Sequence, residues 1–290
     1  MISFQPKELS TAKLHGYLLS AVAPRPIAFA STVDESGQPN LSPFSFFNVF
    51  SANPPILVFS PARRVSNNTV KDTLVNVKAT KEVVINIVNY DLVQQMSLSS
   101  TEYPKGVNEF EKAGLTMLKS DLVKPFRVGE SPVQLECKVN QVIELGDQGG
   151  AGSLVICEVV KLHMASEILN EDNTINQEKL DVVARAGGSY YSRAKMGFFQ
   201  IPKPLSTLGI GVDALPEEIK NSMILTGNDL GMLANVESLP TEDEVKAFLK
   251  DRAERYPSFK AVNTLRAKHI LAQSFLSYGD VDSAWKVLLS

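Results

Sequence analysis

The sequence predicts a mainly β protein, a Greek-key barrel with inserted helices, followed by a C-terminal helical extension. Short segments rich in β-branched residues recur between residues 27 and 164, and few helical patterns interrupt them. Several short strands joined by long connections favour a Greek-key barrel over a βαβ fold. Beyond Pro202-Lys203-Pro204, which has the composition of a linker, the periodicity becomes helical. We therefore expect two parts, residues 1–202 and residues 203–290.

The first strands are predicted from alternation and turn residues. Ile27–Val33 is expected to be a strand, Asp34–Gly37 a turn, and Asn40 the beginning of the returning strand. After the prolines that follow Asn53, Ile56–Ser60 is expected to be a short buried strand.

Three further strands are indicated by β-branched enrichment: Glu82–Val88, Val133–Leu145 and Ser153–Met164. The glycine-rich segment Gly146–Gly150 predicts that the last two form a hairpin. Pairing about that turn places three apolar pairs opposite each other: Val139 with Val155, Cys137 with Cys157, and Leu135 with Val159. We expect the two cysteines to be neighbours that stay reduced.

Helices are predicted between these strands. One begins near Asp72 and turns Leu74 and Val77 inward, another covers roughly Tyr90–Ser100, and a third covers Asn108–Ala113.

The extension predicts three more helices. Thr241–Glu244 is a capping box that opens a helix ending before Pro257. A second helix is expected over Ser258–Tyr278, and a third contains Trp285. The last two resemble one tetratricopeptide-like hairpin, and a single hairpin of this kind needs the barrel or a partner to cover it.

Composition excludes several classes of function. The chain has 290 residues, 44% hydrophobic content, a net charge of −3 and a pI near 5.7, so a basic nucleic-acid-binding face is not expected. No signal peptide or 18-residue apolar segment is seen, and the two cysteines fit a reducing compartment. We expect a cytoplasmic protein without membrane or nucleic-acid partners.

The loop that follows the Ile56–Ser60 strand is crowded with hydrogen-bond donors. It contains Ser60, Arg63, Arg64, Ser66, Asn67, Asn68, Thr69, Lys71 and Thr73, against one acid, Asp72. Because it ends where a helix begins, free backbone N–H groups and the helix dipole favour an anion there. The loop is interpreted as a phosphate cradle, and a solvated surface loop is the alternative.

Other polar residues accompany aromatic side chains. Ser42, Ser45 and Asn48 recur at three-residue spacing among phenylalanines, which are expected to be barrel core rather than an aromatic box. Arg25, held in extended backbone between two prolines, suits an electron-rich ring, or is a surface charge.

The segment Asp181–Arg193 is the second dense group. Two glycines permit close backbone approach, and Tyr191 with Arg193 offers a ring beside a cation. An ordinary turn with exposed tyrosines is the alternative.

Protein-based catalytic machinery is not indicated. Gly209–Ala214 fits a loose dinucleotide pattern, but Pro216 and the lack of a βαβ unit predict a loop. His15, His163 and His269 are isolated, so no metal site is expected. No nucleophile motif is present, and a cofactor would have to carry the chemistry.

The chain resembles the flavin reductase-like, FMN-binding split-barrel family, in particular its flavoredoxin branch. The matching segments are residues 24–60, residues 71–76 with residues 82–88, and residues 183–193. The resemblance spans about residues 20–195 and implies a Greek-key split barrel, commonly a homodimer, with FMN near the dimer interface.

By this resemblance, Ser42, Pro43, Phe44 and Ser45 would line the flavin and its ribityl chain. The phosphate would be surrounded by Ser60, Arg63, Lys71, Asp72 and Thr73, and Tyr191 and Arg193 would lie close to the ring. No side chain is expected to act as a catalytic nucleophile.

The resemblance implies hydride transfer from NADH or NADPH to FMN, as in a flavin reductase. One alternative is a flavoredoxin-like electron carrier that is reduced by another protein. The other is a non-catalytic interaction protein that uses its helical tail.

Overall fold

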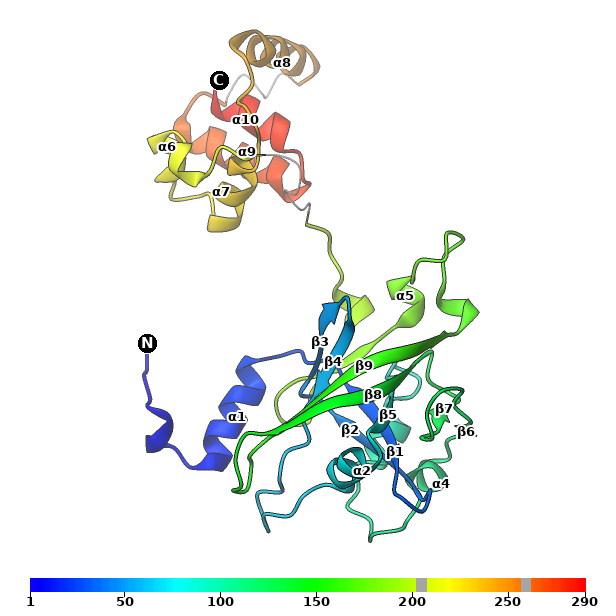
Figure 1. Ribbon diagram of the computed structural model, residues 1–290. Helices are drawn as coiled ribbons and strands as arrows, with labels where there is room; N and C mark the ends of the chain where they lie inside the picture. The colour runs from blue at the N-terminus through cyan, green and yellow to red at the C-terminus, as the bar shows by residue number, and fades with distance from the viewer. Residues whose placement is uncertain (202–207, 257–261) are drawn as a thin grey trace. The chain divides into compact units, whose positions relative to one another are not determined.

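The computed structural model describes residues 1–201, 208–256 and 262–290, which form two compact units, Met1–Phe199 and Gln200–Ser290 (Figure 1). The predicted linker Pro202-Lys203-Pro204 lies outside the described residues.

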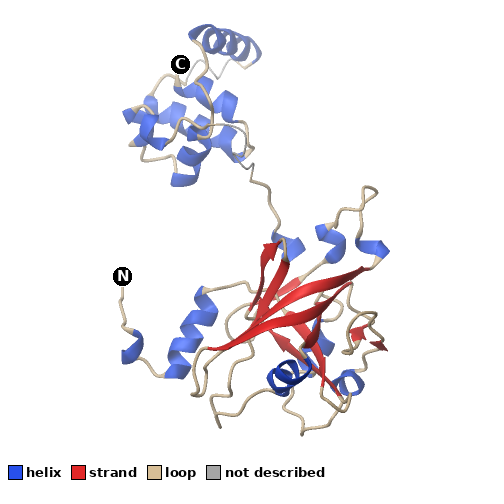
Figure 2. Ribbon diagram, viewed as in Figure 1, coloured by secondary structure: helices blue, strands red, loops and turns tan. Residues whose placement is uncertain are grey.

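The first unit is built on an antiparallel sheet of seven strands in the order β2-β1-β5-β8-β9-β4-β3 (Figure 2). These strands are β1 (Ala28–Val33), β2 (Pro39–Phe44), β3 (Phe47–Ala52), β4 (Pro55–Phe59), β5 (Glu82–Ile87), β8 (Val133–Glu144) and β9 (Ser153–Met164). The strands predicted near these positions are confirmed. β3 was not predicted as a strand, because most of its residues are exposed on both faces and its apolar residues do not alternate.

The sheet curls until its two edges come close together without closing. β2 and β3 lie at opposite ends of the strand order, yet only Ser45 and Phe46 separate them in the chain. Because a fully extended residue spans at most about 3.6 Å, the two edge strands approach within about 11 Å at this connection. The architecture is therefore a split barrel, as the resemblance implies.

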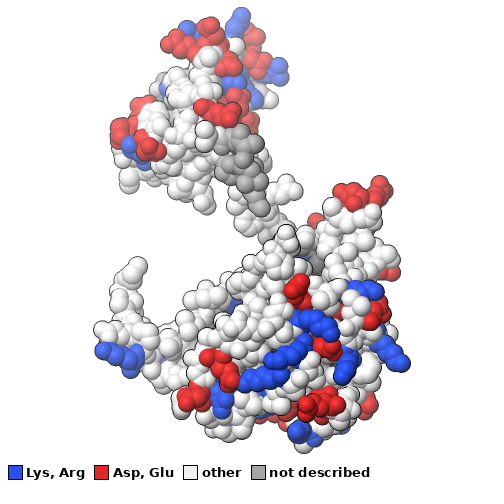
Figure 3. Space-filling view, viewed as in Figure 1, with Lys and Arg blue, Asp and Glu red and all other residues white. Residues whose placement is uncertain are grey.

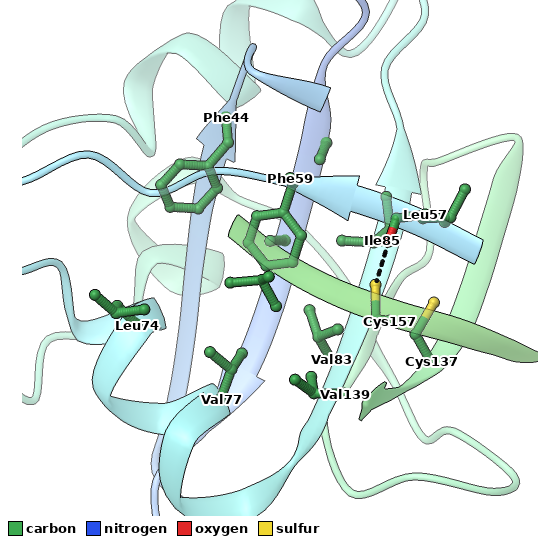
Figure 4. Close-up of a cluster of buried hydrophobic side chains, with 13 residues drawn as sticks. Phe44, Leu57, Phe59, Leu74, Val77, Val83, Ile85, Cys137, Val139 and Cys157 are labelled. Atoms are coloured by element: carbon green, nitrogen blue, oxygen red, sulfur yellow. Dashed lines mark hydrogen bonds between the residues drawn. The ribbon is translucent and has the colours of Figure 1, made fainter. Parts of the chain in front are cut away.

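The barrel interior contains the main core. Phe44 and Phe59 face each other with ring centroids 5.6 Å apart, and both thiols lie among β-branched residues (Figure 4). Cys137 and Cys157 are buried and free, and Cys157 Sγ lies 3.5 Å from the carbonyl oxygen of Leu57. The two cysteines therefore contribute to the hairpin as buried apolar side chains and not as a disulfide.

The register predicted for the β8–β9 hairpin is wrong. Val139 lies opposite Cys157 and Cys137 lies opposite Val159, a shift of two residues, while Leu135 lies opposite Leu162. The turn is longer than its glycines suggest, since Leu145 N–H donates to Gly152 O at 3.0 Å, and the register shifts twice along the ladder. The two-residue shift at Val139 and Cys137 keeps each side chain on its face, so the apolar pattern could not reveal the error there. The shift at Leu135 is three residues, because the ladder is irregular between Glu136 and Cys137.

Helices and short strands complete the first unit. α2 (Asp72–Thr80) buries Leu74 and Val77 against the sheet, as predicted. The other predicted helices are shorter: α3 (Val93–Leu98), and α4 (Glu109–Ala113), which ends at Gly114 with φ +65°. Elements not predicted are α1 (Thr11–Ala21), α5 (Gln177–Leu180), β6 (Met117–Leu118), β7 (Arg127–Val128), β10 (Val183–Arg185) and β11 (Tyr191–Arg193).

The second unit is helical, with α6 (Glu217–Lys220), α7 (Gly227–Ala234), α8 (Glu242–Arg255), α9 (Leu265–Ser277) and α10 (Val281–Leu288). The capping box at Thr241 is confirmed, whereas the predicted start at Ser258 lies outside the described residues and α9 itself begins at Leu265. Gly209–Ala214 forms a loop with one short 3-10 turn, as expected.

This unit has its own core, so the α9–α10 hairpin does not depend on the barrel for cover. Trp285 is 1% exposed, and its indole N–H donates to Leu233 O at 3.0 Å. α6 and α7, which the sequence interpretation missed, supply Ile219 and Leu233 to the same core. Buried His269 accepts from the Ser222 hydroxyl through Nδ1 at 2.7 Å, because that hydroxyl oxygen already accepts two backbone N–H groups.

Candidate functional site

The donor-rich loop before α2 folds so that Arg64 rather than Arg63 points toward Lys71. Arg63 donates to Asn68 Oδ1 and Asn68 O, both at 2.8 Å, and stays within the loop. Arg64 donates from Nη1 to Thr69 Oγ1 and Val70 O, both at 2.9 Å. The loop itself thus fixes the Arg64 guanidinium beside the start of α2.

The N-terminus of α2 offers backbone donors to an anion. Lys71 is the N-cap residue, and its side chain makes no capping hydrogen bond. Thr73 in the first turn is buried, and its hydroxyl oxygen accepts from Asn40 Nδ2 at 2.9 Å. Unsatisfied N–H groups and the positive end of the helix dipole therefore lie beside two cations.

A small cavity of about 30 Å³ lies where these groups meet. Of the sequence-predicted residues, Ser42, Lys71, Asp72 and Thr73 line it. Glu102, which sequence reasoning missed, also lines it, and its carboxylate accepts from Arg64 Nε at 2.8 Å and lies 3.7 Å from Lys71 Nζ. The hydrogen bond and charge of Arg64, with the charge of Lys71, lower the pKa of Glu102.

Ser60 lies at the end of β4, next to this loop. It is 9% exposed, and its backbone N–H donates to Phe46 O at 2.8 Å. The structure therefore places Ser60 at the connection between the two edge strands, beside the loop but outside the lining of the small cavity.

A second cavity, of about 220 Å³, adjoins the first, because Ser100 lines both. Pro43 at the end of β2 and Ser45 just after it line this cavity, together with Tyr191 and Arg185. Phe44 points the opposite way into the barrel core, as alternation along a strand requires. The structure thus brings Pro43, Ser45 and Tyr191 together and excludes Phe44 from this space.

Arg25 is 6% exposed, and its guanidinium donates hydrogen bonds to backbone carbonyl groups. It donates to the carbonyl oxygens of Leu19 and of Val22, the latter at 2.6 Å, near the end of α1. It also donates to Ala186 O at 3.3 Å, and its Nε approaches Ser45 Oγ at 3.4 Å. Burial, and next the charge of Arg185, lower the pKa of Arg25. Arg25 therefore positions Ser45 instead of offering a free cation to a ring.

Tyr191 is paired with Arg185, not with Arg193 as expected. Arg185 Nη1 donates to the Tyr191 hydroxyl at 2.6 Å, and its guanidinium lies 4.8 Å from the ring centroid. Arg193 forms an ion pair with Asp181 at 2.6 Å and lies 3.6 Å from the Tyr90 ring centroid. Tyr191 and Arg193 both line a neighbouring cavity of about 210 Å³.

Asn48 lies apart from the small cavity at the start of α2. It is exposed on β3, where its Oδ1 accepts from Val49 N–H at 2.8 Å, and it borders an apolar cavity of about 330 Å³. The expectation that the neighbouring phenylalanines are core holds for Phe44, whereas Phe46 and Phe50 are exposed.

His163 is not isolated, contrary to the sequence interpretation. His163 Nε2 lies 2.7 Å from Glu136 Oε1, and Asp121 completes a group whose ligand atoms lie within 4.8 Å of one another. The oxygens of buried Glu136 already accept from the backbone N–H groups of Asp121 and Leu122, at 2.9 and 2.6 Å. This group therefore secures a loop against the β8–β9 hairpin.

Charges on the visible face of the barrel are mixed in sign, with basic and acidic side chains side by side (Figure 3). Lys138 pairs with Glu82 at 2.5 Å, and Lys161 pairs with Asp121. This face does not form the uniform basic patch that nucleic-acid binding requires. Among the described residues, no helix is both long and apolar enough to cross a membrane.

Comparison with known proteins agrees with this architecture. The family described as "Flavin reductase like domain" matches residues 20–184. A protein of Aquifex aeolicus (strain VF5) is 39% identical over 193 residues, which cover 67% of this chain and 96% of that protein. About a third of the present chain therefore has no counterpart in that relative.

Two solved structures share the fold of the first unit. Nitrilotriacetate monooxygenase component B from Bacillus cereus is 29% identical, with a TM-score of 0.65, over 70% of this chain and 98% of that one. Flavoredoxin of Desulfovibrio vulgaris (Miyazaki F) is 20% identical, with a TM-score of 0.54, over 64% and 93% of the two chains, which shows the fold alone. The chain belongs to the flavin reductase-like family.

Proposed function

We propose that the protein binds FMN and acts as an NAD(P)H-dependent flavin reductase. The observation that carries this proposal is the meeting of Arg64, Lys71 and the uncapped start of α2 at one point beside a cavity lined by β2. A phosphate needs charge-assisted donors of this kind. The adjoining cavity is lined by Ile27, Met96 and Tyr191, which offer apolar surface to a flat ring.

Each residue then has a role in binding or positioning. Lys71, Arg64 and the α2 backbone would hold the phosphate. Ser42 on β2 lines the same cavity. Pro43, Ser45 and Tyr191 would flank the ring, with Arg25 fixing Ser45 from behind. A bound flavin would supply the redox chemistry by accepting a hydride from NADH or NADPH.

A larger cavity, of about 360 Å³ at the β1–β2 turn, does not suit an anionic cofactor. Asp34, Glu35, Asp72 and Glu109 line it, and Lys105 is the one cation among the described residues of its lining. Its excess of carboxylates would repel a phosphate. The small cavity beside α2 also includes Asp72, Glu102 and Glu109, but it has two cations, Arg64 and Lys71, and the helix N-terminus. The smaller cavities beside α2 are therefore the better candidate.

We also propose that the first unit works as a homodimer. α1 has eleven residues and buries none of them, and an uncovered helix of this length is marginal in water. Leu18 on α1 and Val49 and Phe50 on β3 are more than half exposed. A second copy of the chain would cover these surfaces, and a mass of one chain with flavin fully retained would refute the dimer.

The function is tested by adding FMN, removing free flavin, and mixing the protein with NADH or NADPH without oxygen. Loss of the oxidised flavin absorbance is expected with at least one nucleotide. Retained flavin that neither nucleotide reduces would instead indicate an electron carrier reduced by another protein. Failure to bind any flavin would refute the proposal.

A further inference from the structure

The phosphate subsite of the proposed flavin site is already paired with a carboxylate of the same chain. Glu102 belongs to the segment between α3 and α4, about thirty residues beyond Lys71 in sequence. Its carboxylate accepts from Arg64 Nε at 2.8 Å and lies 3.7 Å from Lys71 Nζ, so it contacts both cations that the phosphate would use.

Glu102 occupies the contacts that a phosphate oxygen would make with these two cations. Its carboxylate accepts from Arg64 Nε and lies beside Lys71 Nζ in the small cavity that all three residues line. Two anions cannot share the same hydrogen-bond donor geometry without repelling each other. A phosphate can therefore take over these contacts only when the Glu102 carboxylate gives them up.

The Arg64 guanidinium would remain in place when Glu102 moves. Arg64 is held independently by Thr69 Oγ1 and Val70 O, so its guanidinium does not depend on Glu102 for its position. Glu102 is itself 61% exposed at the side chain and can swing into solvent. Arg64 is thus preorganised for an anion, and the carboxylate that it binds has to be displaced.

We propose that Glu102 is an internal competitor of the flavin phosphate, which weakens the binding of phosphorylated flavin and favours its exchange over permanent retention. This inference rests on the proposed function. Binding of FMN replaces one carboxylate with a dianionic phosphate at the same cations, and the displaced carboxylate stays close enough to repel it. Riboflavin lacks the phosphate and need not displace Glu102.

The inference is tested with Glu102→Gln, which keeps the size of the side chain and removes its charge. Dissociation constants for FMN and riboflavin are measured by quenching of flavin fluorescence. We expect FMN to bind about three- to tenfold more tightly to the variant, the scale of an exposed ion pair plus like-charge repulsion, and riboflavin to be unchanged. Glu167→Gln is the matched control, since it removes one exposed carboxylate elsewhere in the unit.

The outcomes separate the inference from the function on which it rests. If the wild type binds FMN but Glu102→Gln binds it equally or more weakly, Glu102 does not compete and the inference is overturned alone. Equal tightening of FMN and riboflavin would overturn it as well, because the effect would not act on the phosphate. If neither flavin binds the wild type, the proposed function and this inference both fall.

Discussion

Substitution of Lys71 by glutamine tests whether the start of α2 binds the flavin phosphate. Lys71 is the N-cap residue of α2, its side chain is 28% exposed, and Glu102 lies 3.7 Å from its ammonium. A charge-assisted hydrogen bond contributes about 1.5–3 kcal/mol, and release of the weak pair with Glu102 offsets a small part of the loss. We therefore expect the Kd for FMN to rise about five- to fiftyfold.

The assay is a fluorescence titration with FMN and with riboflavin, so that the phosphate is the only difference between the ligands. Lys78→Gln is the control, because Lys78 lies in the same helix but pairs with Glu144. The control should bind FMN as the wild type does. An unchanged Kd for FMN in Lys71→Gln, or an equal loss of riboflavin, would refute the placement of the phosphate.

Three further predictions concern stability and reactivity. Burial lowers the pKa of His269 below its usual 6.5, so its contribution to stability is complete above that pH and declines as the pH falls through the folded pKa. In chemical denaturation followed by the fluorescence of Trp285, the single tryptophan, the midpoint should fall as the pH is lowered below 6.5, and it should fall less in His269→Asn. Phe59→Ala should cost about 3–5 kcal/mol in chemical denaturation, since the ring is fully buried; a cost below about 1 kcal/mol would contradict its place in the core. Cys137 and Cys157 should resist a thiol reagent until the chain is unfolded, because a hydrogen bond with Cys157 and burial raise the pKa of Cys137; rapid labelling of the native protein would show otherwise.

The strands of the barrel could be predicted because turn residues separate them and β-branched residues fill them. The register of β8 and β9 could not, since a shift of two residues leaves each side chain on the same face. β3 was not predicted because it lies at the sheet edge and most of its residues are exposed, so apolar and polar residues do not alternate along it. Local pattern thus predicted strands better than it predicted their pairing.

The sequence predicted segments that line the candidate cavities, but not which of their residues come together. Arg63 and Arg64 are adjacent, and the choice between them depends on a turn in which Asn68 adopts φ +55° and holds Arg63. Glu102 comes from a distant segment, so no local pattern connects it with Lys71. Likewise, the pairing of Tyr191 with Arg185 depends on the β10–β11 ladder, which is only three residues long.

Because β2 is an edge strand of the open sheet, some of its backbone N–H groups have no partner strand in the described part of the chain. One outward N–H of β2, that of Leu41, is satisfied by Glu109 Oε2 at 3.0 Å. Pro43, two residues further, lies in the same alternating set and has no N–H to leave unpaired. The backbone donors of this edge therefore depend on Pro43, which supplies none, and on Glu109, which occupies that of Leu41. Replacing Pro43 by another residue would add an N–H beside the cavity that Pro43 lines, whereas exchanging one non-proline residue of β2 for another leaves the number of backbone donors unchanged.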